Sequence, residues 1–276
     1  MVASLHLDEA RAAADLRRGG LTRRDRRCRA AVEEWSEQKS PAEDDAGNES
    51  EERSEAGDPH GSTLNLHETI TDMTKPGQIV ILNGAPRSGK SSIVTVIQDT
   101  FDGPWMNLGV DVFVREITPK RYRPGMGLRP GEEGHELAPL VPVFYAALYD
   151  SIAAHSRSGL NVVVDVGHHD RKILADSARR LEGLPVLFVG VRCPIDVVMQ
   201  RRNTGQVGRE GQYAVGSESD PIPPPVERWQ REVHVPGVYD VEVDTSILSP
   251  EECAAVIRRH LDDGPPPSAF RRLAES

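Results

Sequence analysis

One short stretch, GAPRSGKSS over residues 84–92, has residue types and spacing that suit phosphate chemistry. Gly84, Gly89, Lys90 and Ser91 in it match the Walker A pattern G-x-x-x-x-G-K-S. The glycines let backbone amides close around phosphate oxygens, the lysine reaches the terminal phosphates, and the serine hydroxyl ligates Mg²⁺. A glycine-rich turn with a solvated lysine is the alternative. The predicted nucleotide cradle consists of Gly84, Ala85, Pro86, Arg87, Ser88, Gly89, Lys90, Ser91 and Ser92.

Two aspartates follow strand-like segments and indicate how a bound phosphoryl group would be used. Asp111 comes directly after WMNLGV, and Asp165 comes directly after an apolar VVV run. We expect Asp111 to accept the proton of an acceptor hydroxyl, and Asp165 to hold Mg²⁺ together with Ser91. A helix cap or a turn is the alternative for either aspartate. The guanine-reading motif NKxD is absent from the sequence, which disfavours a switch GTPase.

The elements that must position these residues alternate along the chain from Gly77 onward. Apolar runs of strand length are followed by longer stretches of helical period, and the middle strands are continuously apolar rather than alternating. This pattern predicts an α/β fold whose sheet is mainly parallel and buried on both faces. The expected strands are 78–83, 105–110, 161–166, 185–191 and 239–245, and the expected helices begin near 90 and span 139–157 and 249–262.

The polarity of the chain changes along its length, and four segments are predicted from it. Residues 1–36 are helix-prone and rich in arginine, and residues 37–76 form an acidic linker with few apolar side chains. Such a linker buries too little apolar surface to offset its ordering entropy, so we expect it to be disordered. We expect the arginines to form a solvated helix face, with a docking arm as the alternative. Residues 77–264 form the main domain and 265–276 a C-terminal tail.

The composition of the chain indicates which kinds of partner it binds and in which compartment it works. The formal net charge of −10 disfavours nonspecific binding to nucleic acid or to an anionic membrane. The three cysteines, Cys28, Cys193 and Cys253, are widely spaced, which favours a reducing cytoplasm over a disulfide framework or a zinc site. No apolar run approaches membrane-spanning length. The expected partner is a small hydroxylated molecule, and homo-oligomerisation stays open.

Five blocks of sequence, in order, resemble the family of chloramphenicol phosphotransferase-like proteins over roughly residues 77–262. The resemblance implies a P-loop kinase-type three-layer sandwich and an ATP- and Mg²⁺-dependent kinase that phosphorylates a hydroxyl of a small molecule, typically an antibiotic. It puts Asp111 on the family's catalytic base. It also puts an arginine-bearing lid on 200–212, with Arg201 and Arg209 as its arginines. The blocks are GQIVILNGAPRSGKSSIV, PWMNLGVDVF, GLNVVVDV, VLFVGVRCP and VHVPGVYDVEVDTS.

The chain departs from the family pattern where the acceptor would bind. Val166 replaces the second acidic residue that often ends the third strand. The next polar residues, His168, His169 and Asp170, are predicted to form a polar loop at the rim of the site, with a metal site as the alternative. Residues 118–136 are expected to cover the cleft, and 214–227 are an insertion. Side chains expected to line an acceptor pocket are Phe144, Tyr145 and Tyr149.

These departures keep the identity of the acceptor open. A metabolic nucleoside or sugar kinase is an alternative enzyme. A nucleotide-binding regulatory module without catalysis is the alternative from another class. Asp111 favours an enzyme, because a module that only binds nucleotide needs no carboxylate facing the terminal phosphate.

Deleting residues 1–70 is expected to leave a soluble domain that still binds ATP, because the acidic linker lacks an apolar anchor. Size-exclusion chromatography and nucleotide titration of the truncated protein measure this. An insoluble or unfolded product would mean that the N-terminal segment packs on the domain.

Overall fold

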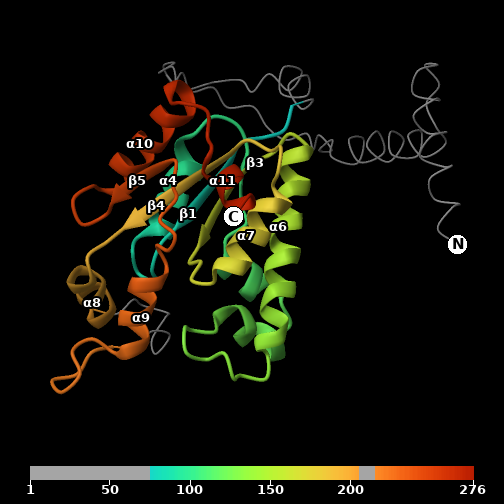
Figure 1. Cartoon of the computed structure of the whole chain (residues 1–276). Helices are drawn as coiled ribbons and strands as arrows, with labels where there is room; N and C mark the ends of the chain where they lie inside the picture. The colour runs from blue at the N-terminus through green and yellow to red at the C-terminus, as the bar shows by residue number, and fades with distance from the viewer. Residues whose placement is uncertain (1–74, 205–214) are drawn as a thin grey trace, which may run out of the picture. The chain divides into compact units, whose positions relative to one another are not determined.

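The computed structural model describes residues 75–204 and 215–276. The predictions for the N-terminal arm, for most of the acidic linker and for Arg209 lie outside these residues. One parallel sheet of five strands, in the order β2-β3-β1-β4-β5, forms the centre of the domain (Figure 1). The strands are β1 (Ile79–Asn83), β2 (Trp105–Asn107), β3 (Asn161–Val166), β4 (Val186–Arg192) and β5 (Val241–Asp244).

Helices connect the strands and extend the domain beyond the last one. Between β2 and α6 the chain forms a π-helical turn at Phe113–Ile117 and two 3₁₀ segments, Lys120–Gly127 and Ala138–Leu140. None of the described helices is long and apolar enough to cross a membrane. They are α4 (Lys90–Thr100), α5 (Val110–Val112), α6 (Val141–Arg157), α7 (Arg171–Arg180), α8 (Ile195–Asn203), α9 (Pro224–Glu232), α10 (Pro250–Asp263) and α11 (Ala269–Ala274).

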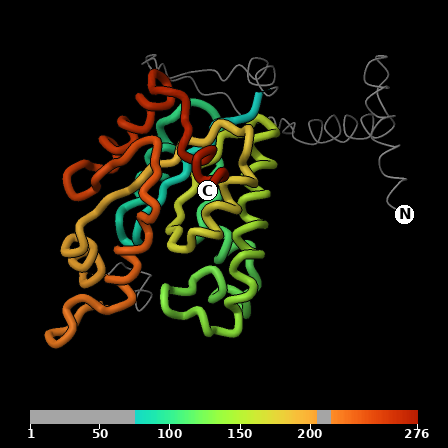
Figure 2. Tube along the Cα trace, in the orientation of Figure 1, coloured from blue at the N-terminus to red at the C-terminus, as the bar shows by residue number. Residues whose placement is uncertain are grey.

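Two apolar cores, one on each face of the sheet, give the domain three layers. Along β1, Ile79 and Ile81 pack toward α6, α7 and α11, whereas Val80 and Leu82 pack toward α4 and α10. Figure 2 shows the same arrangement as a tube. Because each face of the central strands is covered, these strands are apolar on both sides. The predicted three-layer α/β sandwich is therefore confirmed.

Parallel strands present all their carboxyl ends at one edge of the sheet, and this edge collects the polar residues. β1 leads into the glycine-rich loop, β2 leads toward Asp111, and β3 carries Asp165 close to its end. The connection from β1 runs to β2 on one side of it, whereas the connection from β3 runs to β4 on the other side. In open α/β sheets this switch point is where ligands bind.

A tightly packed glycine, Gly77, comes just before the first strand. The Gly77 amide donates to the Ser156 carbonyl oxygen at 2.8 Å, and the Ser156 hydroxyl donates to the Gly77 carbonyl oxygen at 2.7 Å. A Cβ atom on Gly77 would lie 2.1 Å from the Leu160 carbonyl oxygen. Only glycine fits there, so this contact fixes the start of β1 against the end of α6.

The segment predicted as a C-terminal tail is part of the core, which corrects the boundary at residue 264. Phe270 in α11 lies with its ring centroid 4.9 Å from that of Phe188 and 6.4 Å from that of Tyr149. The Asp240 carboxylate accepts from the amides of Ser268 and Ala269 at 2.7 and 2.9 Å. The preceding run of three prolines at 265–267 concealed this short helix in the sequence.

Phe270→Ala is expected to lower the free energy of unfolding by about 3–5 kcal/mol, because it opens a cavity between α11 and β4. Urea denaturation of the purified protein measures the loss. Arg271→Ala, at an exposed position of the same helix, is the matched control and should change stability little. Equal stability of the two variants would show that α11 does not support the core.

Candidate active site

The loop between β1 and α4 has the backbone of a phosphate cradle. Gly89, at the N-cap of α4, has φ 93°, and Arg87 has φ 73°, both in the left-handed region. A Cβ atom on Gly84 would lie 2.5 Å from the Val191 carbonyl oxygen, so the loop closes tightly over β4. The first amides of α4 are available at this end, and a helix N-terminus favours anions. The loop therefore fits a nucleotide phosphate chain.

Lys90 lies in the middle of this loop and is strongly influenced by its surroundings. Its Nζ donates to the carbonyl oxygens of Gly84 and Ala85 at 2.8 and 2.9 Å. Burial lowers the pKa of Lys90 to about 8, against the opposing effect of the Asp165 and Asp111 carboxylates. Both aspartates are thus close enough to interact with the ammonium group.

Ser91 and Asp165 form a pair of oxygen ligands. The Ser91 hydroxyl donates to Asp165 Oδ2 at 2.7 Å. A hydroxyl and a carboxylate are hard donors of the kind that Mg²⁺ prefers, usually together with water and phosphate oxygens. A Cβ atom on Gly109 would lie 1.9 Å from Asp165 Oδ1, so the glycine two residues before Asp111 makes room for this carboxylate. The pair therefore fits a magnesium ion bound with a nucleotide.

The predicted residues meet in one cleft of about 330 Å³, here called the P-loop cleft. Lys90, Ser91, Asp111 and Asp165 all line it. Four arginines also line the cleft. The positive charge of these arginines and Lys90 exceeds the negative charge of the two aspartates, so the cleft suits a polyphosphate. These arginines are Arg87, Arg115, Arg129 and Arg202.

Of the two lid arginines expected from the resemblance, Arg201 does not line the cleft, and its neighbour Arg202 does. Arg201 donates through Nη2 to the Thr245 carbonyl oxygen at 2.7 Å and through Nη1 to Thr245 Oγ1 at 3.1 Å. Arg202 is only 6% exposed. The burial of Arg202 could have been predicted from helical spacing, because Arg202 lies on the same face of α8 as the apolar residues Val198 and Met199.

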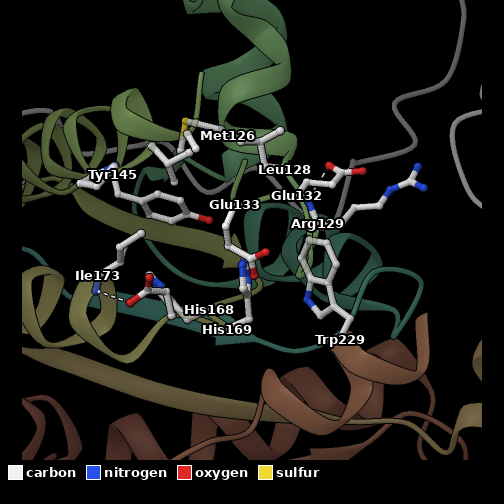
Figure 3. A pocket seen from close by; sticks show the side chains of 14 residues that line it. Met126, Leu128, Arg129, Glu132, Glu133, Tyr145, His168, His169, Ile173 and Trp229 are labelled. Atoms are coloured by element: carbon white, nitrogen blue, oxygen red, sulfur yellow. Dashed lines mark hydrogen bonds between the residues drawn. The ribbon is translucent and has the colours of Figure 1, made fainter. Parts of the chain in front are cut away.

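A second cavity of about 240 Å³, here called the side cavity, adjoins the P-loop cleft (Figure 3). Its walls come from residues 126–133, from α6, from the loop after β3 with the start of α7, and from α9. The segment 118–136 thus contributes residues to both cavities, as expected for a cover over the cleft. Both cavities are lined by Met126, Arg129, Tyr145 and Trp229.

Of the three aromatic residues expected to line an acceptor pocket, only Tyr145 lines either of the two cavities. Tyr149 is fully buried, and its hydroxyl is hydrogen-bonded to His168 Nε2 at 2.6 Å. Phe144 packs on Gly125, where an added Cβ atom would lie 2.9 Å from the ring. The helical period alone cannot distinguish a side chain in the core from one facing a cavity, which explains both errors.

His168 is a buried core residue rather than a rim residue, although its ring still borders the side cavity. Burial lowers its pKa to about 3, so the ring is neutral at pH 7. The ring of His169 lies against Trp229, with centroids 5.2 Å apart. Within residues 75–204 and 215–276, no group of three His, Cys, Asp or Glu residues could hold a metal ion. The metal alternative for this loop therefore lacks a ligand set.

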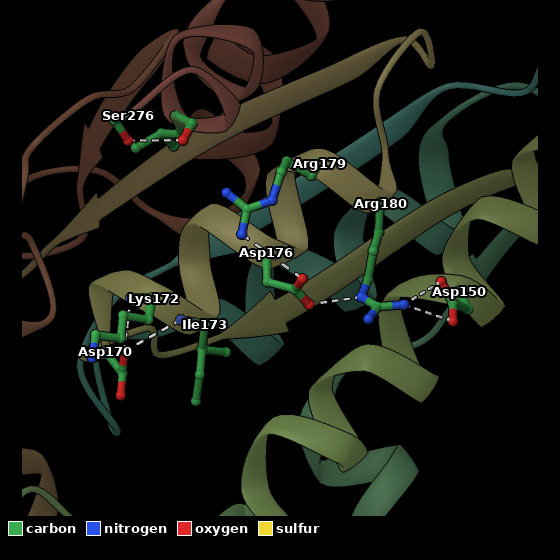
Figure 4. A network of polar contacts seen from close by, with 9 residues as sticks. Asp150, Asp170, Lys172, Ile173, Asp176, Arg179, Arg180 and Ser276 are labelled. Atoms are coloured by element: carbon green, nitrogen blue, oxygen red, sulfur yellow. Dashed lines mark hydrogen bonds and ion pairs between the residues drawn. The ribbon is translucent and has the colours of Figure 1, made fainter.

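Polar contacts fix the wall that α6 and α7 give to the side cavity (Figure 4). Asp170 caps α7, and its Oδ1 accepts from the amides of Lys172 and Ile173 at 2.7 and 3.2 Å. Arg180 joins the two helices, since it donates to Asp150 at 2.9 Å and to Asp176 at 2.7 Å. Asp170 therefore caps the N-terminus of α7 and also lines the side cavity.

A buried amide connects the loops that surround both cavities. Asn83, the last residue of β1, accepts at Oδ1 from the His168 amide at 2.8 Å. Its Nδ2 donates to the Val233 carbonyl oxygen and to the Tyr239 hydroxyl, both at 2.8 Å. The glycine-rich loop, the loop after β3 and the segment after α9 are thereby tied together.

The sequence analysis did not predict α9, which begins inside the expected insertion 214–227. Pro225, Val226 and Trp229 from this helix line the P-loop cleft. Arg228 donates to Glu133 at 3.0 Å and so joins α9 to the segment that carries Arg129. The helix has an apolar face, but three prolines at 223–225 made this region read as a loop.

Comparison with known proteins agrees with this site. Residues 77–262 match the family of chloramphenicol phosphotransferase-like proteins. Sequences from two strains of Mycobacterium tuberculosis, both named as provisional O-phosphotransferases, are 27% identical over 217 residues, which cover 71% of this chain and 88% of the relative. The chain therefore belongs to the chloramphenicol phosphotransferase-like family. It is a phosphotransferase, as the sequence predicted.

Two solved structures are similar at a lower level. A tunicamycin resistance protein of Deinococcus radiodurans is 20% identical, with a TM-score of 0.46, over 67% of this chain and 95% of its own. The APS kinase of Mycobacterium tuberculosis is 16% identical, with a TM-score of 0.47, over 68% of this chain and 99% of its own. Neither likeness bears on the function proposed below.

His168 is expected to make the protein less stable in acid. Because its pKa is lowered to about 3 in the folded state, the unfolded chain binds a proton first as the pH falls below about 6.5. Between pH 7 and pH 5 this one residue should remove about 2 kcal/mol of stability.

Urea unfolding of the wild type and of His168→Gln at the two pH values tests this. The variant should lose less stability on acidification than the wild type. His155→Gln, on α6 outside both cavities, is the control. Identical losses in the wild type and His168→Gln would mean that His168 is not the group responsible.

Proposed function

We propose that the protein transfers the γ-phosphoryl group of ATP to a hydroxyl of a small molecule, with an antibiotic as the proposed class of acceptor. The observation that carries the proposal is the position of Asp111. Its carboxylate lines the same cleft as Lys90, Ser91 and Asp165, and a second cavity opens beside that cleft. One cavity suits a nucleotide phosphate chain, and the other has room for an acceptor.

The residues from Gly84 to Ser92 would hold the phosphates of the nucleotide, and Ser91 with Asp165 would hold Mg²⁺. When bound, ATP supplies the phosphoryl group and Mg²⁺ neutralises part of its charge. To reach a phosphate, the Lys90 ammonium would exchange its bonds to the Gly84 and Ala85 carbonyl oxygens for bonds to phosphate oxygens. Charge-assisted hydrogen bonds of this kind are the stronger ones.

In this proposal Asp111 is the general base. The acceptor oxygen would lose its proton to the Asp111 carboxylate and bond to the γ-phosphorus, while the bond from that phosphorus to the bridging oxygen breaks and ADP leaves. Lys90, whose ammonium group interacts electrostatically with Asp111, lines the same cleft. A module that only binds nucleotide would not require this group.

Cations of the P-loop cleft would stabilise the phosphoryl group during transfer. Lys90 and Arg202 are the proposed groups, because both are at least half-buried and line the cleft. Arg201, which contacts Thr245, would act indirectly by holding the glycine-rich loop against the segment after β5. Arg209 is retained as a lid arginine from the family resemblance alone.

The side cavity is the proposed acceptor site. Its wall combines apolar side chains such as Leu128 and Ile173 with the polar groups of Asp170 and His169. This mixture suits a compact molecule with both apolar and hydroxylated parts. The antibiotic class rests on the family to which the chain belongs. The proposed compartment is the cytoplasm, where ATP is abundant and the free thiols of Cys193 and Cys253 stay reduced.

Asp111→Asn is expected to lower acceptor phosphorylation by about 10²–10⁴-fold, because the amide keeps the shape of the carboxylate but cannot take the proton. The affinity for Mg·ATP should change little. Acceptor-dependent ADP release over a panel of hydroxylated antibiotics, nucleosides and sugars measures the first effect. Isothermal titration calorimetry measures the second.

Asp99→Asn, an exposed position on α4, is the matched control and should retain full activity. A full rate in Asp111→Asn would make Asp111 a structural residue. Collapse of ATP binding would instead place Asp111 in the magnesium shell, and the proposal of a dedicated base would lose its support.

A further inference from the structure

Tyr145 has a buried side chain whose hydroxyl makes no hydrogen bond to any described residue. The residue is only 8% exposed. Tyr149, one turn further along α6, is also buried, but its hydroxyl is bonded to His168 Nε2 at 2.6 Å. The Tyr145 hydroxyl is not among the fully buried atoms without a partner and is open to the cavities that the residue lines, so it is available to a ligand there.

The hydroxyl of Tyr145 is directed into the space between the two cavities. Tyr145 lines both the P-loop cleft and the side cavity. In Figure 3 its ring extends from α6 and its oxygen points to the middle of the cavity, with Trp229 on the opposite wall. Lys90 and Asp111 line the P-loop cleft, whereas His169 and Asp170 line the side cavity. Tyr145 is one of the four residues that the two cavities share, so a group bound at their junction lies near it.

The surroundings of Tyr145 keep its hydroxyl protonated. Burial, together with the negative charge of Asp170, raises the pKa of Tyr145 to about 12. At neutral pH the group is therefore a hydrogen-bond donor. A neutral donor of this kind can bind an anionic oxygen through a short, charge-assisted hydrogen bond.

We propose that the Tyr145 hydroxyl donates a hydrogen bond to the phosphoryl group that is transferred between the two cavities, an inference that rests on the proposed function. The phosphoryl oxygens carry the negative charge and are the better acceptors. A hydrogen bond donated to the acceptor's own oxygen would instead withdraw electron density from the nucleophile. Tyr145 would touch the reacting group and is in this sense a catalytic residue.

Tyr145→Phe tests the proposal, because it removes the hydroxyl and leaves the ring in the core. Titration calorimetry of the full chain with Mg·AMP-PNP and with Mg·ADP separates a contact with the γ-phosphoryl group from general effects on nucleotide binding. The dissociation constant for Mg·AMP-PNP is expected to rise about tenfold or more, as for loss of a hydrogen bond to a charged group. That for Mg·ADP should change less than about twofold.

Tyr149→Phe is the matched control on the same helix, since its hydroxyl has a protein partner and lines neither cavity. It should leave both dissociation constants unchanged and lower the midpoint of thermal unfolding by about 2–8 °C, because His168 loses its partner. Tyr145→Phe should show the opposite pattern, with an unchanged midpoint and weaker binding of Mg·AMP-PNP.

Equal changes for the two nucleotides in Tyr145→Phe, or no change for either, would overturn the assignment. A lower thermal midpoint without a change in nucleotide preference would make Tyr145 a structural residue. If the wild type binds Mg·AMP-PNP and phosphorylates no hydroxyl, the proposed function fails while the contact of Tyr145 can still be measured. If the wild type binds neither nucleotide, both proposals fail.

Discussion

The buried side chain of Asn83 is the contact on which the geometry of both cavities depends. It ends the central strand and is 1% exposed. Its three hydrogen bonds reach the His168 amide, the Val233 carbonyl oxygen and the Tyr239 hydroxyl. An amide in the interior is costly unless its donors and acceptor are paired, and a fully paired one is rigid. Three loops far apart in sequence therefore have one common attachment next to Gly84.

The P-loop cleft next to Asn83 is lined by both positively and negatively charged side chains. The glycine-rich loop and α8 contribute cations to the P-loop cleft, and the ends of β2 and β3 contribute Asp111 and Asp165. Lys90 lies between the two groups, and its lowered pKa reflects the cost of keeping an ammonium ion out of water. A polyphosphate would repay that cost, since it brings negative charge to the same place. The arrangement is therefore poised for an anionic ligand with its counter-ion.

The parts of the site that follow regular rules could be predicted from the sequence, and the parts set by tertiary packing could not. The glycine-rich motif predicted the loop before α4. Asp165 lies near the end of β3, and Asp111 lies in α5, four residues after β2 ends, so the parallel topology brings both aspartates to the same edge of the sheet. Arg202 was missed by one position, because the family resemblance was used instead of the helical face of α8. Helices α9 and α11 were not predicted because runs of three prolines lie at or just before their first turns. Tyr149 was expected to line a pocket because buried residues and cavity-lining residues recur with the same helical period.

The walls of the two cavities come from different kinds of structure, and this bears on how the family can diversify. The P-loop cleft is built at the ends of β1 and β3, where a substitution disturbs the sheet as well as the chemistry. Much of the side cavity comes from residues 126–133 and from Trp229, which lie on connecting segments outside the sheet. Apart from Met126, which packs in the core on one face of the sheet, the residues of these segments lie outside the central core. With the acceptor in the side cavity, as proposed, a lineage could acquire a new substrate by drift in these connections and keep its phosphate cradle unaltered.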